Sequence, residues 1–307
     1  MRRGLCAAVP RRSNGHAPSE DPGACILRAM RNPHHVCRVF GSPWEGVHGT
    51  RISSDRHYGR HWHATFGVGV IDEGAQSSAS GCGQVDAYAG NLIATNPGEV
   101  HDGRPLGGSA RRWRMLYLEP DALRWAVDAA SVGAVQDMAW LRPVIVDDGL
   151  RRVLGELLRT LETGPRADAP RCEELLVQAC TMLAERHGAQ RLPTRAASAD
   201  VSRAREMLAD SLARPPSLGE LAAASGLSKF QLLRRFRQVH GVTPFAWLLQ
   251  QRTEAARGLI RQGAELTDAA MAVGFADQSH MTRAFVQHFG FTPGAWRRTW
   301  VRPAPLQ

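Results

Sequence analysis

The sequence has little lysine: Lys229 is the only one, although arginine brings the basic total to 38 of 307 residues. No apolar run approaches the roughly 18 residues that a membrane-spanning helix requires, so we expect no membrane protein of that kind. The six cysteines include no Cys-x-x-Cys pair and no zinc-ligand spacing, which argues against a disulfide scaffold and a zinc finger. These absences favour a protein of the reducing cytoplasm.

The remaining composition is that of a globular protein of about two domains, with 43% apolar and 22% charged residues. The formal net charge is +9, and residues 198–307 carry +6 of it. An excess of this sign suits a polyanionic partner such as a nucleic acid. Residues 1–33 lack the apolar stretch of a secretory signal, so we expect a disordered lead or a start assigned too early, with Met30 a possible true start.

Residues 36–118 have the pattern of many short strands separated by Gly, Pro and Asn turns, which predicts a small barrel or sandwich. The expected strands are Val36–Phe40, Trp62–Ile71, Gln84–Tyr88, Asn91–Thr95 and Trp113–Leu118.

Two amphipathic helices are then expected at 150–162 and 171–186, because apolar residues recur there at helical spacing. They would cover a face of the barrel or pair with a second copy of the chain. The polar, aperiodic stretch 188–199 predicts a linker, so the first domain would span 34–187 and the second 200–302.

The second domain contains an internal repeat. Leu221–Leu227 is echoed by Ala269–Phe275, and Phe236–Trp247 by Phe285–Trp296 with the same internal spacing. Such a repeat predicts two similar helical units.

The first unit has the parts of a helix-turn-helix. Ser217 and Glu220 form one capping box and Ser228 and Gln231 a second, while Gly226 allows the sharp turn between the two helices. On the helix that begins at 229, helical spacing predicts one buried and one outward face. The buried residues would be Leu232, Phe236 and Val239, and the outward ones Phe230, Arg234 and Arg237.

The second unit repeats this scheme. Its buried residues would be Met281, Phe285 and Phe289, with Ser279, His280, Arg283 and Gln287 outward. Outward arginines on one helix pair are usually only solvated, and a purely structural helical tail stays an alternative. Two matched copies favour nucleic-acid binding.

A connector predicted to be helical begins at Thr243-Pro244 and runs through 245–262. Eighteen residues at 1.5 Å rise would span about 27 Å. That length suits two reading helices in successive major grooves, about 34 Å apart on one face of B-DNA.

Residues 200–300 resemble the DNA-binding domain of the AraC/XylS family of bacterial transcription regulators, through both turn glycines, Phe236, Phe285, Arg252 and the closing G-F-T-P-G-A-W-R. The resemblance implies base-facing positions at Phe230, Leu233 and Arg234, and at Gln278, Ser279, His280, Thr282 and Arg283. Helical spacing by itself puts Gln278 near the buried side. We expect the DNA-contacting surface to include also Ser228, Lys229, Gln231 and Arg237.

Residues 36–118 resemble, more loosely, the cupin-like effector barrel of this family, through His61-Trp62-His63 and Pro97-Gly-Glu-Val-His101. Metal-binding cupins use an H-x-H pair, a following Glu and a later His, but no carboxylate follows His63 closely here. Three imidazoles would still suffice for zinc or iron with an open position. Because the resemblance implies a regulatory barrel without catalysis, we expect these histidines to be structural or to contact an effector rather than to bind a metal. The expected effector residues are His61, His63, Glu99, His101 and Trp113, with no cofactor.

The sequence thus predicts an α+β chain, in which a cupin-like β-barrel with following helices precedes an all-α domain of two helix-turn-helix units joined by a long helix. The resemblance implies a cytoplasmic, sequence-specific regulator, more an activator than a repressor, and not an enzyme. Its expected partners are double-stranded promoter DNA, a small-molecule effector, RNA polymerase and a second copy in a homodimer, with no membrane. The alternative is a metal-dependent cupin enzyme whose helical tail tethers it to DNA.

Overall fold

The computed structural model describes residues 34–81, 83–128, 138–164, 169–190 and 199–300, and all of them belong to one compact unit that begins at His34. The predicted lead at 1–33 and most of the predicted linker lie outside the described residues.

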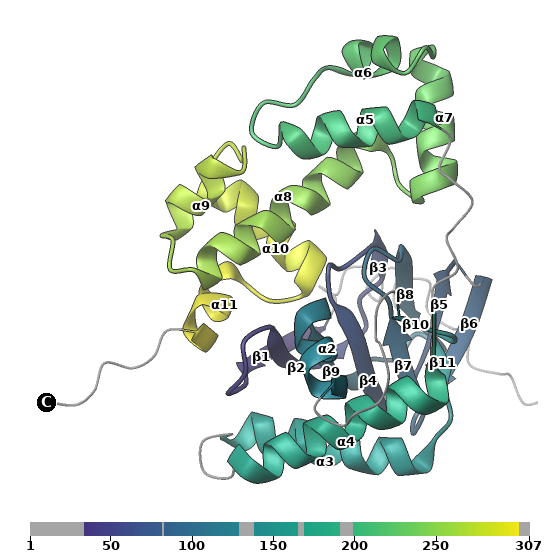
Figure 1. The fold of residues 1–307 in the computed structure, drawn as a ribbon, viewed down its shortest axis with the longest axis vertical. Helices are drawn as coiled ribbons and strands as arrows, with labels where there is room; N and C mark the ends of the chain where they lie inside the picture. Colours follow the sequence, from purple (N-terminus) through teal and green to yellow (C-terminus); the bar gives the residue numbers. More distant parts are fainter. Residues whose placement is uncertain (1–33, 82, 129–137, 165–168, 191–198, 301–307) are drawn as a thin grey trace, which may run out of the picture. The chain divides into compact units, whose positions relative to one another are not determined.

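The N-terminal domain, residues 34–190, is built on two antiparallel sheets (Figure 1). The larger has the order β1-β2-β9-β4-β7-β11 and the smaller the order β3-β8-β5-β6. The strands are β1 (His35–Gly41), β2 (Val47–Ser54), β3 (Tyr58–His61), β4 (Phe66–Glu73), β5 (Ala75–Ser80), β6 (Gly83–Tyr88), β7 (Leu92–Thr95), β8 (His101–Pro105), β9 (Arg111–Leu118) and β11 (Val144–Ile145).

The larger sheet is buried on both faces, as the alternation along β9 illustrates. Trp113 and Met115 join an apolar cluster that includes Ala87 of the smaller sheet, so this face looks into the space between the sheets. Leu116 and Leu118 point the other way, into the main core beneath the helices.

Three helices cover that other face: α2 (Pro120–Asp128), α3 (Asp148–Thr163) and α4 (Ala169–His187). The leucines of α3 that gave the helical pattern are buried in the core of this same chain. These helices therefore cover the sheet, which is one of the two roles expected for them, and the expected pairing with a second copy as dimerisation helices stays a prediction.

Two predicted boundaries were wrong. The strand expected from Trp62 begins at Phe66, because 62–65 form the connection from β3 to β4. The first residues of the predicted linker form β12 (Gly188–Gln190), which pairs with β10 (Met138–Trp140). Backbone pairing with a distant segment is not visible in local composition.

The C-terminal domain is helical, with two clusters of helices at opposite ends of one long helix (Figure 1). The long helix α8 contributes Trp247 and Leu248 to the first cluster and Ala256 and Ile260 to the second. The helices are α5 (Ala199–Asp210), α6 (Leu218–Ala224), α7 (Lys229–His240), α8 (Pro244–Arg261), α9 (Leu266–Ala272), α10 (Gln278–Phe289) and α11 (Pro293–Trp300).

The predicted caps and turns of the repeat are confirmed. Both capping boxes form, at Ser217 with Glu220 and at Ser228 with Gln231. Gly226 has φ +63°, in the left-handed region that favours glycine. The first unit therefore begins and turns where the sequence indicated.

Candidate functional site

The second helix of the first unit, α7, presents a mostly exposed surface. Leu233 is half-buried and Phe230 is 73% exposed. The side chains of Ser228 and Gln231 are occupied by the capping box, in which Ser228 Oγ accepts from the Gln231 N–H at 3.3 Å and Gln231 Oε1 from the Ser228 N–H at 2.9 Å. The other expected contact residues of α7 are exposed: Lys229, Arg234 and Arg237.

One buried position of α7 was predicted wrongly. Val239 is 43% exposed, whereas Leu232 and Phe236 are fully buried as expected. Val239 lies in the last turn of α7, where it lines an open hollow rather than the core of its own unit.

The corresponding helix α10 exposes Gln278, Ser279 and Arg283, while His280 and Thr282 are half-buried. Gln278 was placed near the buried side by helical spacing, which is wrong because it is the first residue of the helix. The helix is capped by Asp277, whose carboxylate accepts from the His280 N–H at 2.6 Å. This cap was not predicted from the sequence, although Asp is among the preferred residues at that position.

The arginines at the centre of each surface are unpaired within the described part of the chain. Neither Arg234 nor Arg283 lies within ion-pair distance of a described carboxylate. Their guanidinium groups are thus available to an external acceptor. Between the two units, α8 has the 18 residues that the connector was expected to have.

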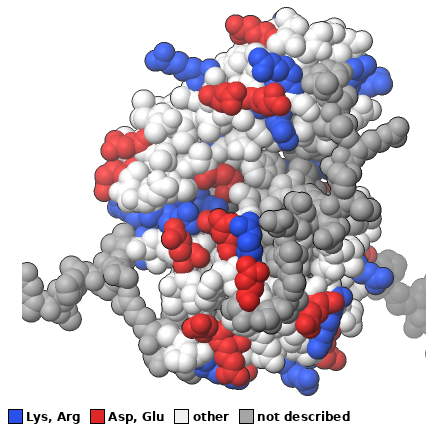
Figure 2. Space-filling model, viewed as in Figure 1, with Lys and Arg blue, Asp and Glu red and all other residues white. Residues whose placement is uncertain are grey.

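On the face drawn in Figure 2, basic and acidic side chains are interspersed rather than gathered into one patch, so charge does not mark a binding surface on that face. The candidate nucleic-acid interface is therefore defined by the two exposed helix faces. Among the described residues, no helix is both long and apolar enough to cross a membrane.

A cavity of about 90 Å³ lies inside the N-terminal domain. That volume has room for several water molecules or a small organic molecule. Its apolar lining comes from both sheets and includes Ile52, Ile93 and Met115. Trp113 also lines it, as expected for an effector residue.

A buried cation, Arg111, also lines the cavity and was not predicted from the sequence. Arg111 is 1% exposed, and its guanidinium lies 4.7 Å above the Trp113 ring. Its Nε donates to Gln76 Oε1 at 3.1 Å and its Nη1 to the Arg56 carbonyl at 3.2 Å, with no described carboxylate at ion-pair distance. Burial lowers the pKa of Arg111 to about 10, so it stays charged at neutral pH. Only the long-range fold puts this arginine inside the domain.

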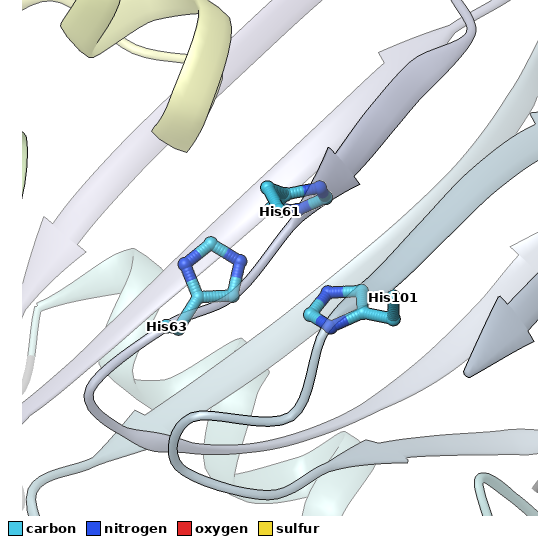
Figure 3. Close-up of side chains that lie close together, drawn as sticks. All are labelled: His61, His63 and His101. Atoms are coloured by element: carbon cyan, nitrogen blue, oxygen red, sulfur yellow. The ribbon is translucent and has the colours of Figure 1, made fainter. Parts of the chain in front are cut away.

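The three expected histidines do meet at the cavity (Figure 3). The ring centroids of His61 and His101 are 4.4 Å apart, and those of His61 and His63 are 4.9 Å apart. Burial lowers the pKa of all three imidazoles, and for His61 and His63 their mutual repulsion lowers it further. They are therefore neutral near pH 7 and able to act as hydrogen-bond partners or metal ligands.

Glu99 does not join them. Its carboxylate lines the cavity but accepts from the Asn96 side-chain amide at 2.9 Å, within its own turn. Trp62, between the first two histidines, does not line the cavity and packs edge-on to His288.

The C-terminal domain reaches this cavity, which no local signal indicated. His288 and Phe289 of α10 line it beside His63, whose ring stacks on Phe289. Nearby, the buried carboxylate of Glu254 on α8 accepts from the Ala64 N–H at 3.1 Å and lies 2.9 Å from Arg257 Nε.

The groups around Glu254 keep its carboxylate ionised at neutral pH. Its burial opposes ionisation, but Arg257, His288 and the Ala64 N–H together lower its pKa to about 2. Arg257 in turn lies 3.7 Å from Glu119, which also pairs with Arg261 at 2.6 Å. Ionised side chains thus tie α8 to the N-terminal domain.

Comparison with known proteins assigns both halves of the chain. An AraC-like ligand binding domain matches residues 47–179, and a helix-turn-helix domain matches residues 221–299. The uncharacterized HTH-type transcriptional regulator YbfI of Bacillus subtilis is 28% identical over 223 residues, which cover 72% of this chain and 80% of YbfI. The transcriptional activator NphR of a Rhodococcus species is 37% identical over 87 residues, 28% of this chain and 26% of NphR.

Among solved structures, apo ToxT of Vibrio cholerae is similar with a TM-score of 0.48 and 9% identity, covering 88% of this chain and 99% of ToxT. Two domain matches in this order, and a regulator related over most of its length, agree with the sequence and with the two helix-turn-helix units. The chain belongs to the AraC family of transcription regulators, with an effector-binding domain followed by a helix-turn-helix domain.

Proposed function

We propose that this regulator binds double-stranded promoter DNA by inserting α7 and α10 into successive major grooves. The observation that carries the proposal is the pair of matched helices at the two ends of α8, each with an exposed arginine that has no described carboxylate partner. Arginine is suited to bidentate recognition of guanine in the major groove. Phe230 and Leu233 would add apolar contacts, for example with a thymine methyl group.

The other expected contact residues have different duties in this proposal. Ser228 and Gln231 hold the start of α7, while Lys229 in its first turn and Arg237 in its last turn would supply charge to phosphates. Gln278, Ser279, His280 and Thr282 form the corresponding surface around Arg283.

The small-molecule effector would bind in the cavity of the N-terminal domain. His61, His63, His101 and Trp113 would line its site, and Glu99 would shape the rim through its turn. The unpaired, buried guanidinium of Arg111 supports an effector with an anionic group, because a buried cation is stabilised by a charged partner. The apolar lining supports a small organic body attached to that group.

We assign the chain no catalytic step, since it belongs to a family of transcription regulators. Activation through RNA polymerase is the direction that the relative NphR supports, as that protein is a transcriptional activator. We further propose that the regulator acts as a homodimer. It would act in the cytoplasm, where it has access to the chromosome. Effector binding would shift the population of arrangements in which both helices reach one duplex.

The test is selection of bound fragments from sheared genomic DNA by the full-length protein, followed by titration of one selected fragment and of a scrambled duplex. We expect the selected fragment to bind at least about 1,000-fold more tightly than the scrambled duplex at physiological salt. Equal affinity for both would contradict sequence-specific regulation. Genes beside the selected fragments would indicate the chemistry of the effector.

A further inference from the structure

The strongest unexplained feature of the molecule is a group of four imidazoles from distant segments. His61 ends β3, His63 follows it, His101 begins β8, and His288 comes from α10 of the other domain. The centroid of the His288 ring lies 5.1 Å from that of His63 and 5.8 Å from that of His61. The ligand nitrogens of the first three all lie within 4.8 Å of one another, and so do those of His63 and His288 with a Glu254 oxygen.

Hydrogen bonds fix the orientation of two of these rings. His61 Nδ1 donates to the Gly59 carbonyl at 2.7 Å, and His101 Nδ1 donates to the Glu99 carbonyl at 2.9 Å. With the proton on Nδ1, each ring keeps an unprotonated Nε2 with a free lone pair. A backbone carbonyl that orients a ring in this way is the usual second contact of a metal-bound histidine.

The remaining two rings are also without a strong partner. His288 Nε2 is buried and has no hydrogen-bond partner among the described residues, and the nearest oxygen, on Glu254, is 3.6 Å away. His63 is buried and has only ring contacts among the described residues. Several lone pairs at this spacing repel one another unless an electrophile lies between them.

A proton is a poor candidate for that electrophile, because burial disfavours the charged form of these rings. A divalent transition metal is a better one, since neutral imidazole suits zinc, cobalt and nickel, whereas calcium and magnesium prefer oxygen ligands. The ionised carboxylate of Glu254 offers compensating negative charge beside the cluster. The three histidines that the sequence brought together favoured an organic ligand over a metal. The fourth imidazole, contributed by α10, reverses that preference.

We propose that His61, His63 and His101 bind one divalent transition-metal ion of the zinc class, and that His288 completes the site from α10. Four nitrogens around zinc at 2.0–2.1 Å would lie about 3.4 Å apart, so the ligand nitrogens of His61, His63 and His101, which lie within 4.8 Å of one another, need movements of about 1–2 Å, and His288 must turn from Glu254 toward them. Because His288 belongs to the same helix as Arg283, the bound metal fastens the second helix-turn-helix unit to the N-terminal domain. The ion thereby acts on DNA binding, a consequence that rests on the proposed function.

The first experiment titrates cobalt(II) into chelator-dialysed full-length protein and follows the visible absorption, with zinc competition giving the affinity. We expect one ion per chain and a nitrogen-rich tetrahedral spectrum. His61→Gln and His101→Gln should each weaken binding at least about 100-fold, and His288→Gln about 10-fold. His57→Gln is the matched control, because His57 is exposed and lies just before β3, outside the cluster.

Failure to saturate at one ion per chain would overturn the proposal, as would variants that all bind like His57→Gln. X-ray absorption spectroscopy of the zinc-loaded wild type identifies the ligands directly, so the test does not depend on the folding of the variants. Three or more imidazole ligands support the site, and fewer than three contradict it.

The second experiment measures binding of the selected DNA fragment with and without zinc. For the wild type we expect the affinity to change at least about 5-fold, in the range typical of coupled sites, and for His288→Gln we expect the change to disappear. An equal zinc effect in both proteins would contradict the fastening role of His288. Absence of DNA binding in every sample would count against the proposed function, while the cobalt titration would still decide the metal site.

Discussion

The two helix-turn-helix units have the same local structure but different surroundings. Position by position, Val239 of α7 corresponds to His288 of α10, yet Val239 is 43% exposed and His288 is 6% exposed. His288 is covered because the N-terminal domain lies against α10, where His35 Nε2 also contacts the Gly290 carbonyl at 2.7 Å. The first unit has an open hollow at the equivalent place.

The two units therefore differ in how they contact the N-terminal domain, although the repeat makes them alike in sequence. The first unit contacts the N-terminal domain through Val100, which packs against its core, and presents the large apolar Phe230 where the second has Ser279. The second unit contributes His288 and Phe289 to the lining of the cavity. We therefore expect effector or metal binding to act mainly through α10.

The largest expected effect tests the part that the units share. Phe236→Ala and Phe285→Ala should each lower the free energy of unfolding by about 3–5 kcal/mol, because both rings are fully buried. Urea unfolding measures this, with Phe230→Ala as the exposed control, expected within about 0.5 kcal/mol of wild type. A loss below about 1 kcal/mol at one position only would show that the two cores are not equivalent.

The next effect concerns Glu254, through which α8 contacts the N-terminal domain. Glu254→Ala should destabilise the chain by about 3 kcal/mol, since it leaves the buried Arg257 without its nearest carboxylate. The pKa of Glu254 is lowered from 4.5 to about 2, so its contribution is present above pH 4.5 and is lost as the pH falls toward 2.

Urea unfolding of wild type and Glu254→Ala across that pH range checks the sign. The two curves should converge as the pH falls, and a constant difference would refute the assignment of charge. Glu265→Ala, which removes an exposed partner of Arg297, is the control and should cost at most about 1 kcal/mol at any pH.

A smaller effect is expected at the DNA surface. Arg234→Ala and Arg283→Ala should each weaken binding of the selected fragment by about 1–3 kcal/mol. Arg152→Ala on α3 removes the same charge from an exposed position outside the helical domain and should change the affinity little. Equal losses for Arg152→Ala would mean that net charge, rather than the two helix faces, accounts for binding. A fluorescence-anisotropy titration measures all three.

The smallest effect concerns the caps, which differ between the units. Ser228→Ala and Asp277→Ala should each cost about 1 kcal/mol of stability, because each removes an acceptor for the first N–H groups of its helix. Thermal unfolding measures both variants. A loss at Ser228 but none at Asp277 would show that α10 is held by its domain contact instead of its cap.

The sequence was most informative where the cause was local. Caps, turn glycines and the spacing of Phe236 and Phe285 depend on neighbours within a few residues, so both units and the length of α8 could be predicted. The meeting of His61, His63 and His101 could be expected too, through the resemblance rather than the pattern. By contrast, nothing in the sequence around Arg111 distinguishes it from the other arginines. It is a buried cation only because the fold places it between two sheets.

The errors have one physical origin, which is contact between distant segments. Val239 was predicted to be buried because helical spacing cannot tell a face that another domain covers from one that stays open. His288 and Glu254 gave no local signal of a contact with the N-terminal domain, since their partners there lie more than 180 residues earlier in the chain. The strand β12 was missed for the same reason, as its partner β10 comes about 50 residues before it.

The most direct test of the central claim is the binding of wild type, Arg234→Ala and Arg283→Ala to every single-base variant of the selected DNA fragment. We expect each arginine variant to lose discrimination at its own short set of bases, with the two sets about 10 base pairs apart. Loss of affinity that is uniform over all sequences, or two sets that coincide, would contradict reading by α7 and α10 in successive major grooves.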